Sequence, residues 1–305
     1  MIPSIVCIGG ANIDRKLRSR EALTMGSSNP AVQLEAFGGV ARNVAENLAR
    51  LGLPTRLITA VGDDAAGRAL LAHAAEAGLS SDGSLLAPGE PTGSYTAVLD
   101  AGGQMLLALA AMPLADRLTP DFLRDCALPA EATLVLDLNL PAASIAALLA
   151  RAREAGLAVI AVAVSEPKMA RLPADLHGLQ CLILNRGELR ALLPGAADDE
   201  ARLADLQRRG LRQIVVTAGG SGLLCSEAGQ AAQQLPAPPV ATIVDVTGAG
   251  DALAAGICAS LTRLPLASAC RVGLELAALT LQTTATVHPG LSPAWLAEHL
   301  EAHHP

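Results

Sequence analysis

Residues 245–251 read DVTGAGD and lead directly into the apolar stretch ALAAGICASL at residues 252–261. The glycines in this segment allow a tight turn and let a ligand approach the backbone closely. A helix that begins at such a turn directs its free N–H groups and the positive end of its dipole toward the ligand. We therefore predict an anion site at Gly248, Ala249 and Gly250, where a buried helix starts.

Asp251 stands in the first turn of this predicted helix, next to the anion site. A carboxylate there repels a simple anion, but it can orient and deprotonate a hydroxyl that attacks a phosphoryl group. An acid in a first helical turn is also common for purely structural reasons, because it interacts favourably with the helix dipole. The segment alone leaves both interpretations open, and the first makes Asp251 the candidate catalytic base.

On the amino-terminal side of this segment, strand-like runs alternate with helical ones. The predicted strands span residues 4–8, 55–61, 133–137, 158–164, 181–184 and 213–217, and the predicted helices span 40–51, 65–77, 142–155, 186–193 and 201–209. This alternation predicts an α/β fold in which a mostly parallel sheet carries helices on both faces. Helical patterns then dominate the end of the chain, at residues 249–264, 266–281 and 293–299.

Two stretches break the alternation, at residues 23–37 and 95–110. Both have the pattern of short antiparallel strands without helices between them, and Gly102 and Gly103 form a turn in the second. We expect a small sheet over the strand ends, where α/β proteins bind ligands. Because no linker or internal repeat interrupts the chain, we expect one domain over residues 1–305, with lid segments at about 15–37 and 92–112.

The composition excludes several classes of protein. With 22 Lys and Arg against 29 Asp and Glu, the net charge of −7 argues against a protein that coats nucleic acid. Hydrophobic residues make up 51% of the chain, which excludes intrinsic disorder, yet no apolar run reaches the roughly 18 residues of a membrane-spanning helix. Six scattered cysteines without a CxxC pair indicate buried, unpaired thiols. Since the start of the chain lacks the basic region of a secretion signal, we expect a cytoplasmic protein.

Two common nucleotide-binding motifs are absent. No GxxxxGK[ST] occurs, and residues 8–14, IGGANID, do not fit GxGxxG. A P-loop ATPase and a standard dinucleotide-binding domain are therefore both disfavoured. The turn after the first predicted strand instead supplies Asn12 and Asp14, and one carboxylate can accept hydrogen bonds from two neighbouring hydroxyls of a ribose. The alternative for Asp14 is a loop-capping role.

Three further segments follow predicted strands or open predicted helices. Gly38 and Gly39 precede a helix with Asn43 one turn inside it, so a sugar can lie against bare backbone there, although a plain helix start fits too. Asn185 and Glu188 can hold water around Mg²⁺, which keeps much of its hydration in proteins. The segment with Thr217, Gly219 and Gly222 offers backbone N–H groups and a hydroxyl to nucleotide phosphates. Each of these segments alone also has a structural interpretation.

Taken in chain order, the segments GGANID, GGVARN, NRGE, TAGGSG and DVTGAGD resemble the signatures of the ribokinase-like (PfkB) carbohydrate kinases. Those signatures read Gly-x-Asn-x-Asp, Gly-Gly-x-x-x-Asn, Asn-x-x-Glu, Thr-x-Gly-x-x-Gly and Asp-Thr-x-Gly-Ala-Gly-Asp. The resemblance covers residues 8–251 and fits the length of the whole chain. It implies a three-layer α/β sandwich with a small β-strand lid, and a kinase that uses ATP and Mg²⁺.

The resemblance also implies a role for each motif residue. Asp251 becomes the catalytic base, and Gly248, Ala249 and Gly250 become the anion hole. The remaining implied roles are substrate binding by Asn12, Asp14, Gly38, Gly39 and Asn43, ATP contact by Asn185, Glu188, Thr217, Gly219 and Gly222, Mg²⁺ binding through water by Glu188, and a K⁺ ion near Asp245 and Thr247.

Within the family, GGANIDRK, residues 27–30 and GGVARNVAENLARLG are most similar to the kinases that phosphorylate the 5′-hydroxyl of pseudouridine. Three positions depart from the expected pattern. Val246 replaces a Thr whose backbone carries the function, Ala111 stands where an acid is expected, and His288 stands where Asn is expected. The last two concern recognition of the base or sugar more than phosphoryl transfer.

Three alternatives remain at this stage. The first is the same chemistry on another nucleoside or on a sugar such as ribose or fructose. The second is a sugar or nucleoside sensor without catalytic activity, against which the intact DVTGAGD segment argues. A dinucleotide-dependent oxidoreductase is a more distant third. In each case the expected partner is a small molecule and not nucleic acid or membrane, and a homodimer through the lid is expected because a small exposed sheet has edges to cover.

Overall fold

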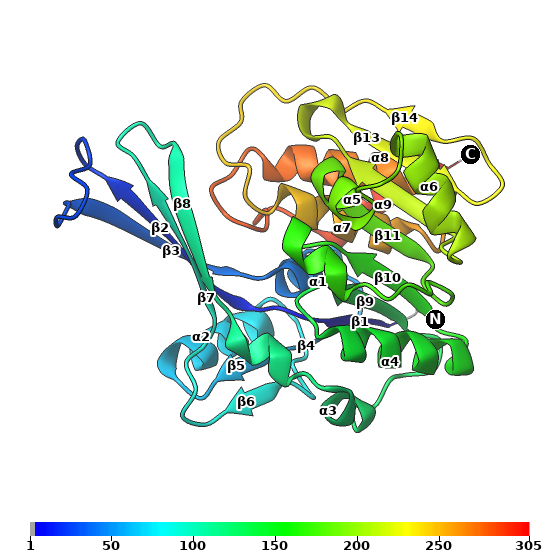
Figure 1. Ribbon diagram of the computed structural model, residues 1–305, viewed down its shortest axis with the longest axis horizontal. Coiled ribbons are helices and arrows are strands. Elements are labelled where there is room, and N and C mark those ends of the chain that lie inside the picture. Colours follow the sequence, from blue (N-terminus) through cyan, green and yellow to red (C-terminus); the bar gives the residue numbers. More distant parts are fainter. Residues whose placement is uncertain (1–3, 305) are drawn as a thin grey trace.

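The computed structural model describes residues 4–304. Its main sheet has eight strands in the order β14-β13-β12-β11-β10-β9-β1-β4 (Figure 1). Six of them run parallel: β1 (Ile5–Ile8), β4 (Thr55–Ile58), β9 (Thr133–Asp137), β10 (Ala158–Val162), β11 (Cys181–Asn185) and β12 (Gln213–Thr217). The antiparallel strands β13 (Leu223–Glu227) and β14 (Gln233–Leu235) complete one edge.

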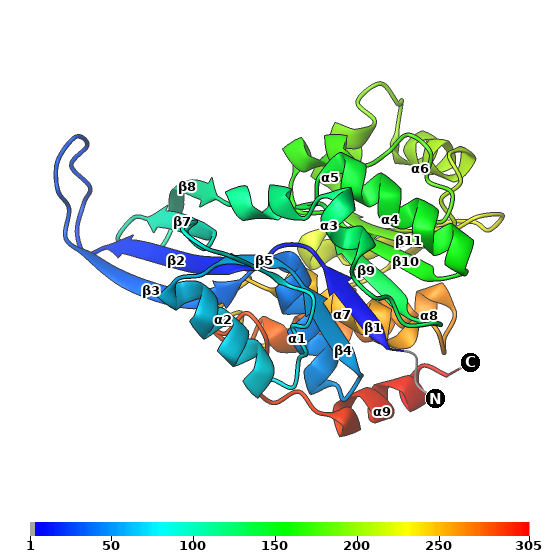
Figure 2. The same ribbon diagram turned by 90° about the horizontal axis from the view of Figure 1, so that it is seen from below.

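Helices cover both faces of this sheet and make three layers (Figures 1 and 2). One layer contains α1 (Val40–Arg50), α7 (Ala249–Ser260) and α8 (Leu266–Thr280), and α9 (Pro293–Ala302) packs beside it. The other contains α3 (Pro120–Arg124), α4 (Ala142–Ala155), α5 (Arg186–Leu192) and α6 (Asp199–Arg208). Short 3₁₀ turns lie at η1 (Pro113–Arg117), η2 (Glu166–Arg171) and η3 (Gly219–Ser221).

The alternation of side chains along the strands explains the two cores. In β1, Ile5 and Cys7 pack into the core under α1, α7 and α8, whereas Val6 and Ile8 pack into the core under α4 and α5. Both faces are covered, so the strands are continuous apolar runs rather than alternating ones. The carboxyl ends of the parallel strands meet at one edge, which is where the motif residues are found.

A second sheet, here called the small sheet, projects from the main body toward the left of Figure 1. Its strand order is β3-β2-β7-β8, with β2 (Asn12–Ser19), β3 (Ala31–Gly38), β7 (Ser94–Leu99) and β8 (Met105–Ala111). A separate pair joins β5 (Ala60–Gly62) to β6 (Leu85–Ala87), and α2 (Ala65–Glu76) lies next to β5 and β2.

The predicted α/β sandwich with a small β-strand sheet is confirmed, with three corrections. Asn12 and Asp14 lie inside β2 and not in a turn, because their backbone pairs with β3 and β7. The predicted strand 55–61 is two strands, β4 and β5, which belong to different sheets. Strands β13 and β14 were not predicted, because the apolar part of β13 is only three residues long and β14 is a three-residue strand that begins with two glutamines.

Two expectations drawn from composition can be compared with the described residues. All six cysteines are free thiols, as predicted, and all but Cys126 are buried. Among residues 4–304, none of the helices combines the length and the apolar character needed to cross a bilayer.

Candidate active site

The turn before α7 takes a conformation that only glycine allows. Gly248 caps the helix with a φ of 81°, and a Cβ at this position would lie 2.0 Å from the carbonyl oxygen of Thr286. At Gly250, by contrast, a Cβ would meet no atom within 4 Å, so the space over the first turn is open. The N–H of Ala249 donates to the carbonyl oxygen of Val246 (3.4 Å), so the N–H groups that α7 leaves for a ligand in this open region are those of Gly250 and Asp251.

Asp251 lies in this first turn and is held by Asn43 from α1. The side-chain amide of Asn43 donates a hydrogen bond of 2.7 Å to Oδ2 of Asp251. Burial raises the pKa of Asp251 to about 7 against the opposing effect of this hydrogen bond, and the charges of Asp137 and Asp14 raise the pKa further. A carboxyl group with a pKa near neutrality can exchange a proton with a substrate hydroxyl at physiological pH.

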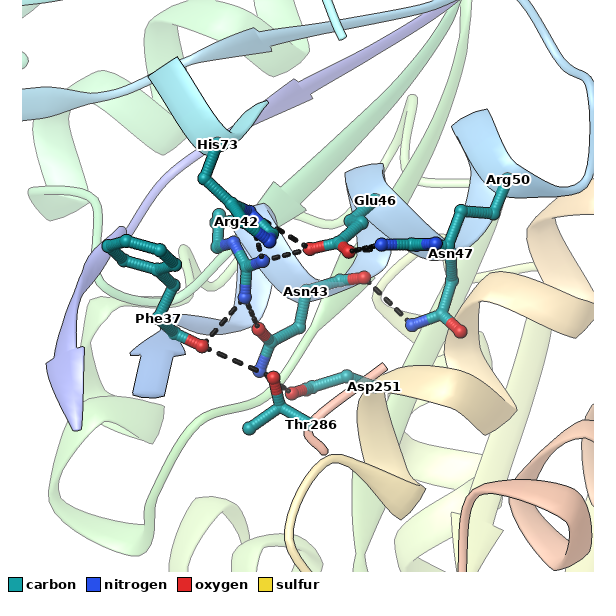
Figure 3. Close-up of polar contacts among 9 residues, drawn as sticks. All are labelled: Phe37, Arg42, Asn43, Glu46, Asn47, Arg50, His73, Asp251 and Thr286. Atoms are coloured by element: carbon teal, nitrogen blue, oxygen red, sulfur yellow. Dashed lines mark hydrogen bonds and ion pairs between the residues drawn. The ribbon is translucent and has the colours of Figure 1, made fainter. Parts of the chain in front are cut away.

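Asn43 is itself oriented by Arg42, whose guanidinium is almost completely buried. Arg42 donates hydrogen bonds to the side-chain oxygen of Asn43 (2.8 Å) and to the carbonyl oxygen of Phe37 (2.7 Å), and it pairs with Glu46 (Figure 3). Since the amide oxygen of Asn43 faces Arg42, its NH₂ group must face Asp251. Figure 3 shows this chain of contacts running from Glu46 to Asp251.

Sequence reasoning missed Arg42 and Glu46. Both residues are 2% exposed, although they are charged. Arg50 also pairs with Glu46, with its guanidinium 2.8 Å from Oε1, so the carboxylate of Glu46 has two cationic partners on the same helix. The available signal was an Arg and a Glu four residues apart on the face of a predicted helix that also carries buried apolar residues.

The predicted sugar-binding residues gather where β2, β3 and α1 meet. Asn12 donates a hydrogen bond of 2.6 Å to Oδ1 of Asp14, and burial raises the pKa of Asp14 above its ordinary value. The carboxylate lies directly over Gly38, since a Cβ there would be 2.1 Å from Oδ2 of Asp14. Gly39 follows as the N-cap of α1. The structure thus brings four of the five predicted substrate residues to one corner, and Asn43 connects that corner to Asp251.

Asp137, at the end of β9, is a third residue of this region that the sequence did not single out. Its carboxylate accepts hydrogen bonds from the backbone N–H groups of Gly10 (2.9 Å), Ala41 (3.0 Å) and Asn139 (2.8 Å). It therefore ties the glycine turn after β1 to the start of α1. Its position at the carboxyl end of a predicted strand was the available signal.

Asn185 and Glu188 form a capping box at the start of α5. The side chain of Asn185 accepts from the backbone of Glu188 (2.9 Å), and Glu188 accepts from the backbone of Asn185 (2.8 Å). Burial and the nearby charge of Glu166 raise the pKa of Glu188, although the backbone hydrogen bond works against them. The carboxyl group of Glu166 is therefore near enough to Glu188 to oppose its ionisation. Within residues 4–304 no three His, Cys, Asp or Glu side chains are arranged as a metal centre.

Thr217, Gly219 and Gly222 lie in the turn between β12 and β13. Thr217 pairs in register with Asn185, so these two segments are neighbours at the same edge of the sheet. Gly222 has a φ of 87°, and a Cβ there would lie 2.0 Å from the carbonyl oxygen of Leu235. Within the described residues no hydrogen bond joins this turn to Asp251, which lies in α7.

A cavity of about 1070 Å³ separates the small sheet from residues 243–247. Asp14 and Tyr95 line it from the small sheet, and Asp245 and Thr247 line it from the other side. Lys16 of β2 reaches across, with Nζ 2.5 Å from Oδ2 of Asp245 and 2.8 Å from Oγ1 of Thr247. Asp245 and Thr247, which were expected near K⁺, are therefore in contact with the ammonium group of Lys16.

Comparisons with known proteins identify the family of this chain. The profile of the pfkB family of carbohydrate kinases matches residues 3–293. A pseudouridine kinase of Escherichia coli is 33% identical over 298 residues, covering 95% of this chain and 94% of that protein. A guanosine-inosine kinase of Exiguobacterium acetylicum is 27% identical, covering 96% of this chain and 98% of that protein. A carbohydrate kinase structure from Agrobacterium tumefaciens has a TM-score of 0.82 and 32% identity, covering 98% and 97% of the two chains. The chain therefore belongs to the pfkB family of carbohydrate kinases, which are phosphotransferases with an alcohol group as acceptor.

Proposed function

We propose that this kinase transfers the γ-phosphoryl group of ATP to the 5′-hydroxyl of pseudouridine. The observation that carries the proposal is the placement of Asp251 in the first turn of α7, with Asn43 hydrogen-bonded to Oδ2 and Asp14 close enough to affect its pKa. This arrangement joins an anion site, a base and a candidate ribose site. The likeness to a pseudouridine kinase over 95% of the chain supports the choice of acceptor.

Asp251 acts as the general base in this proposal. Asn43 occupies Oδ2, while Oδ1 has no hydrogen-bond partner within the described part of the chain and is available to the acceptor hydroxyl. The N–H groups at the start of α7 stabilise the negative charge of the transferred phosphoryl group. Since the transition state for phosphoryl transfer is loose, correct positioning of the hydroxyl contributes more than the basicity of Asp251.

The ribose is bound at the corner formed by β2, β3 and α1. Asp14 accepts hydrogen bonds from neighbouring ribose hydroxyls, and Asn12 keeps its carboxylate in place. The bare backbone of Gly38 and Gly39 lets the sugar ring approach. The small sheet then lies over the bound nucleoside as a lid, with Tyr95 among the residues that line the cavity.

The nucleotide is placed at the neighbouring strand ends. Thr217, Gly219 and Gly222 approach ATP, and Asn185 and Glu188 support the phosphates. Mg²⁺, when bound, would neutralise charge on the phosphates, and Glu188 would contact it through water, since Mg²⁺ keeps much of its hydration in proteins. This assignment predicts that substitution of Glu188 weakens the response to Mg²⁺ more than it weakens nucleoside binding.

A second candidate is a kinase for another nucleoside. The 27% identity to a guanosine-inosine kinase over 96% of the chain favours it, as do Ala111 and His288, which depart from the pattern expected for pseudouridine. A sugar such as ribose or fructose remains a further acceptor to test. A sensor without catalytic activity is disfavoured, because Asp251 and the glycine turn are both in place.

The test is release of ADP from ATP and Mg²⁺ with pseudouridine, uridine, guanosine, ribose and fructose presented in parallel. We expect kcat/KM to be highest for pseudouridine, with a phosphorylated product at the 5′ position. Faster turnover of guanosine or a sugar would keep the mechanism and reject the substrate. Binding of nucleosides without any turnover would reject the kinase mechanism itself.

A further inference from the structure

The contact between Lys16 and residues 245–247 joins two parts of the molecule that are far apart in the chain. Lys16 belongs to β2 of the small sheet, while Asp245 and Thr247 precede the helix that carries the candidate base. The ammonium group lies 2.5 Å from Asp245 and 2.8 Å from Thr247. The side chains of Lys16 and Asp245 are 30% and 22% exposed, so the pair is shielded from solvent on most sides.

The oxygen atoms around this ammonium are already organised for a cation. Asp245 uses Oδ1 to accept from the backbone N–H (2.9 Å) and the hydroxyl (2.7 Å) of Thr247, which leaves Oδ2 directed at Lys16. Although burial works to raise it, the hydrogen bonds from Lys16 and Thr247 keep the pKa of Asp245 below its ordinary value. Asp245 is therefore a carboxylate whose charge is balanced by Lys16.

A free K⁺ ion does not fit these side chains while Lys16 is in place. The side-chain oxygen atoms of Asp245 and Thr247 already accept hydrogen bonds from a group with the charge of K⁺. A second cation at the same atoms would meet repulsion at short range. An ammonium is a compact point charge with three donors, so it can take the place of a monovalent ion among oxygen atoms.

We propose that Lys16 is a built-in monovalent cation that shapes the turn leading to the anion site and makes the enzyme independent of K⁺. Residues 245–247 are followed at once by Gly248, so the position of Asp245 and Thr247 determines where α7 begins. Asp14 lies two residues before Lys16 on the same strand and therefore points to the same face. Strand β2 thus carries both Asp14, the candidate ribose-binding residue, and Lys16, the cation that contacts the turn.

The experiment compares the wild type with Lys16→Met in KCl and in tetramethylammonium chloride at equal ionic strength. The thermal unfolding midpoint and kcat of the wild type are expected to be the same in both salts. For Lys16→Met we expect a lower midpoint and lower kcat in tetramethylammonium, with KCl restoring kcat by about tenfold or more. A thallium-205 NMR signal that broadens only with the variant would report the new ion site directly.

Arg15→Met is the matched control, because it removes a positive charge from the adjacent position of β2. Arg15 pairs with Glu35 on the neighbouring strand, and 38% of its side chain is exposed. We expect this variant to respond to neither salt. Only the kinetic measurement depends on the proposed function, because unfolding and thallium binding can be followed without turnover.

Two results would overturn the proposal. The first is a wild-type protein whose midpoint or kcat rises in KCl, and this result does not depend on whether any variant folds. The second is a folded Lys16→Met protein with wild-type kcat and no response to KCl or thallium. Loss of turnover in every protein, with the expected unfolding response, would instead reject the proposed function and leave the role of Lys16 intact.

Discussion

Asp251 combines two properties that rarely occur together on a surface acid. It is half-buried, and the loss of hydration raises its pKa to about 7. It also accepts a hydrogen bond of 2.7 Å from Asn43, which lowers the pKa in part. Arg42 determines which end of the Asn43 amide faces Asp251. The proton affinity of the base is therefore set by neighbours on α1 as well as by its own helix.

We expect Asp251→Asn to fold and to lose several orders of magnitude in kcat, because no group then accepts the proton of the acceptor hydroxyl. Circular dichroism and single-turnover phosphoryl transfer would establish both points.

In the wild type, kcat/KM should fall as the pH drops below about 7, since a protonated Asp251 cannot act as base.

The same pKa shift affects stability. The pKa of Asp251 in the folded protein lies above the ordinary value near 4, so the folded protein binds a proton at Asp251 more tightly than the unfolded chain does. This proton stabilises the folded protein at low pH, and the stabilisation is lost as the pH rises through about 7. Asp251→Asn does not ionise, so this variant does not lose stability as the pH rises. Its unfolding midpoint at pH 8 should therefore equal or exceed that of the wild type, and a clearly lower midpoint would contradict the buried carboxylate.

At the scale of elements, the turn into α7 depends on two glycines for different reasons. Gly248 has a φ of 81° and no room for a side chain beside Thr286, whereas Gly250 has free space around it. The fold requires Gly248 for the turn itself, whereas Gly250 leaves space in which a ligand can lie. The two roles can be separated by one substitution at each position.

Gly248→Ala should lower the unfolding midpoint by roughly several degrees and reduce kcat, because the turn must move away from Thr286. Gly250→Ala should leave the midpoint unchanged or slightly higher, since alanine favours a helix more than glycine does. It should nonetheless reduce kcat by about tenfold or more, because its methyl group occupies the space assigned to the phosphoryl group. Full activity of Gly250→Ala would place the phosphoryl group elsewhere.

At the scale of the whole molecule, the small sheet is the part with the most exposed apolar surface. Leu107 and Leu109 of β8 are 45% and 66% exposed and do not line the cavity. β8 is also an edge strand with unpaired backbone groups on one side. Both features are those of a surface that a second copy of the chain can cover.

We therefore expect a homodimer through the small sheet in sedimentation velocity at micromolar concentration. Leu109→Glu should shift the protein to monomer, because it places a charge in the apolar contact. Met25→Glu is the control, since Met25 is 86% exposed in the loop between β2 and β3. A wild-type monomer, or a dimer unaffected by Leu109→Glu, would exclude this interface.

The sequence by itself determined the elements and the motifs. Strand β9 and helix α4 coincide with their predicted ranges, because continuous apolar runs and helical periodicity depend on near neighbours in the chain. The start of α7 directly after Gly248 was likewise visible as a glycine turn before an apolar helix. The first residues of β2, Asn12 to Asp14, were misread as a turn, because their pairing is with the strands of a separate sheet.

Only the tertiary structure decided which of these residues meet. Asn43 and Asp251 are 208 positions apart, and Lys16 and Asp245 are 229 apart, yet each pair lies within hydrogen-bond distance. Local patterns carry no information about contacts at such separations, because those contacts arise from the order of strands in the sheet and from the packing of α1 against α7. For the same physical reason, the buried charges of Arg42 and Glu46 appear in the sequence only as an ordinary helical pair.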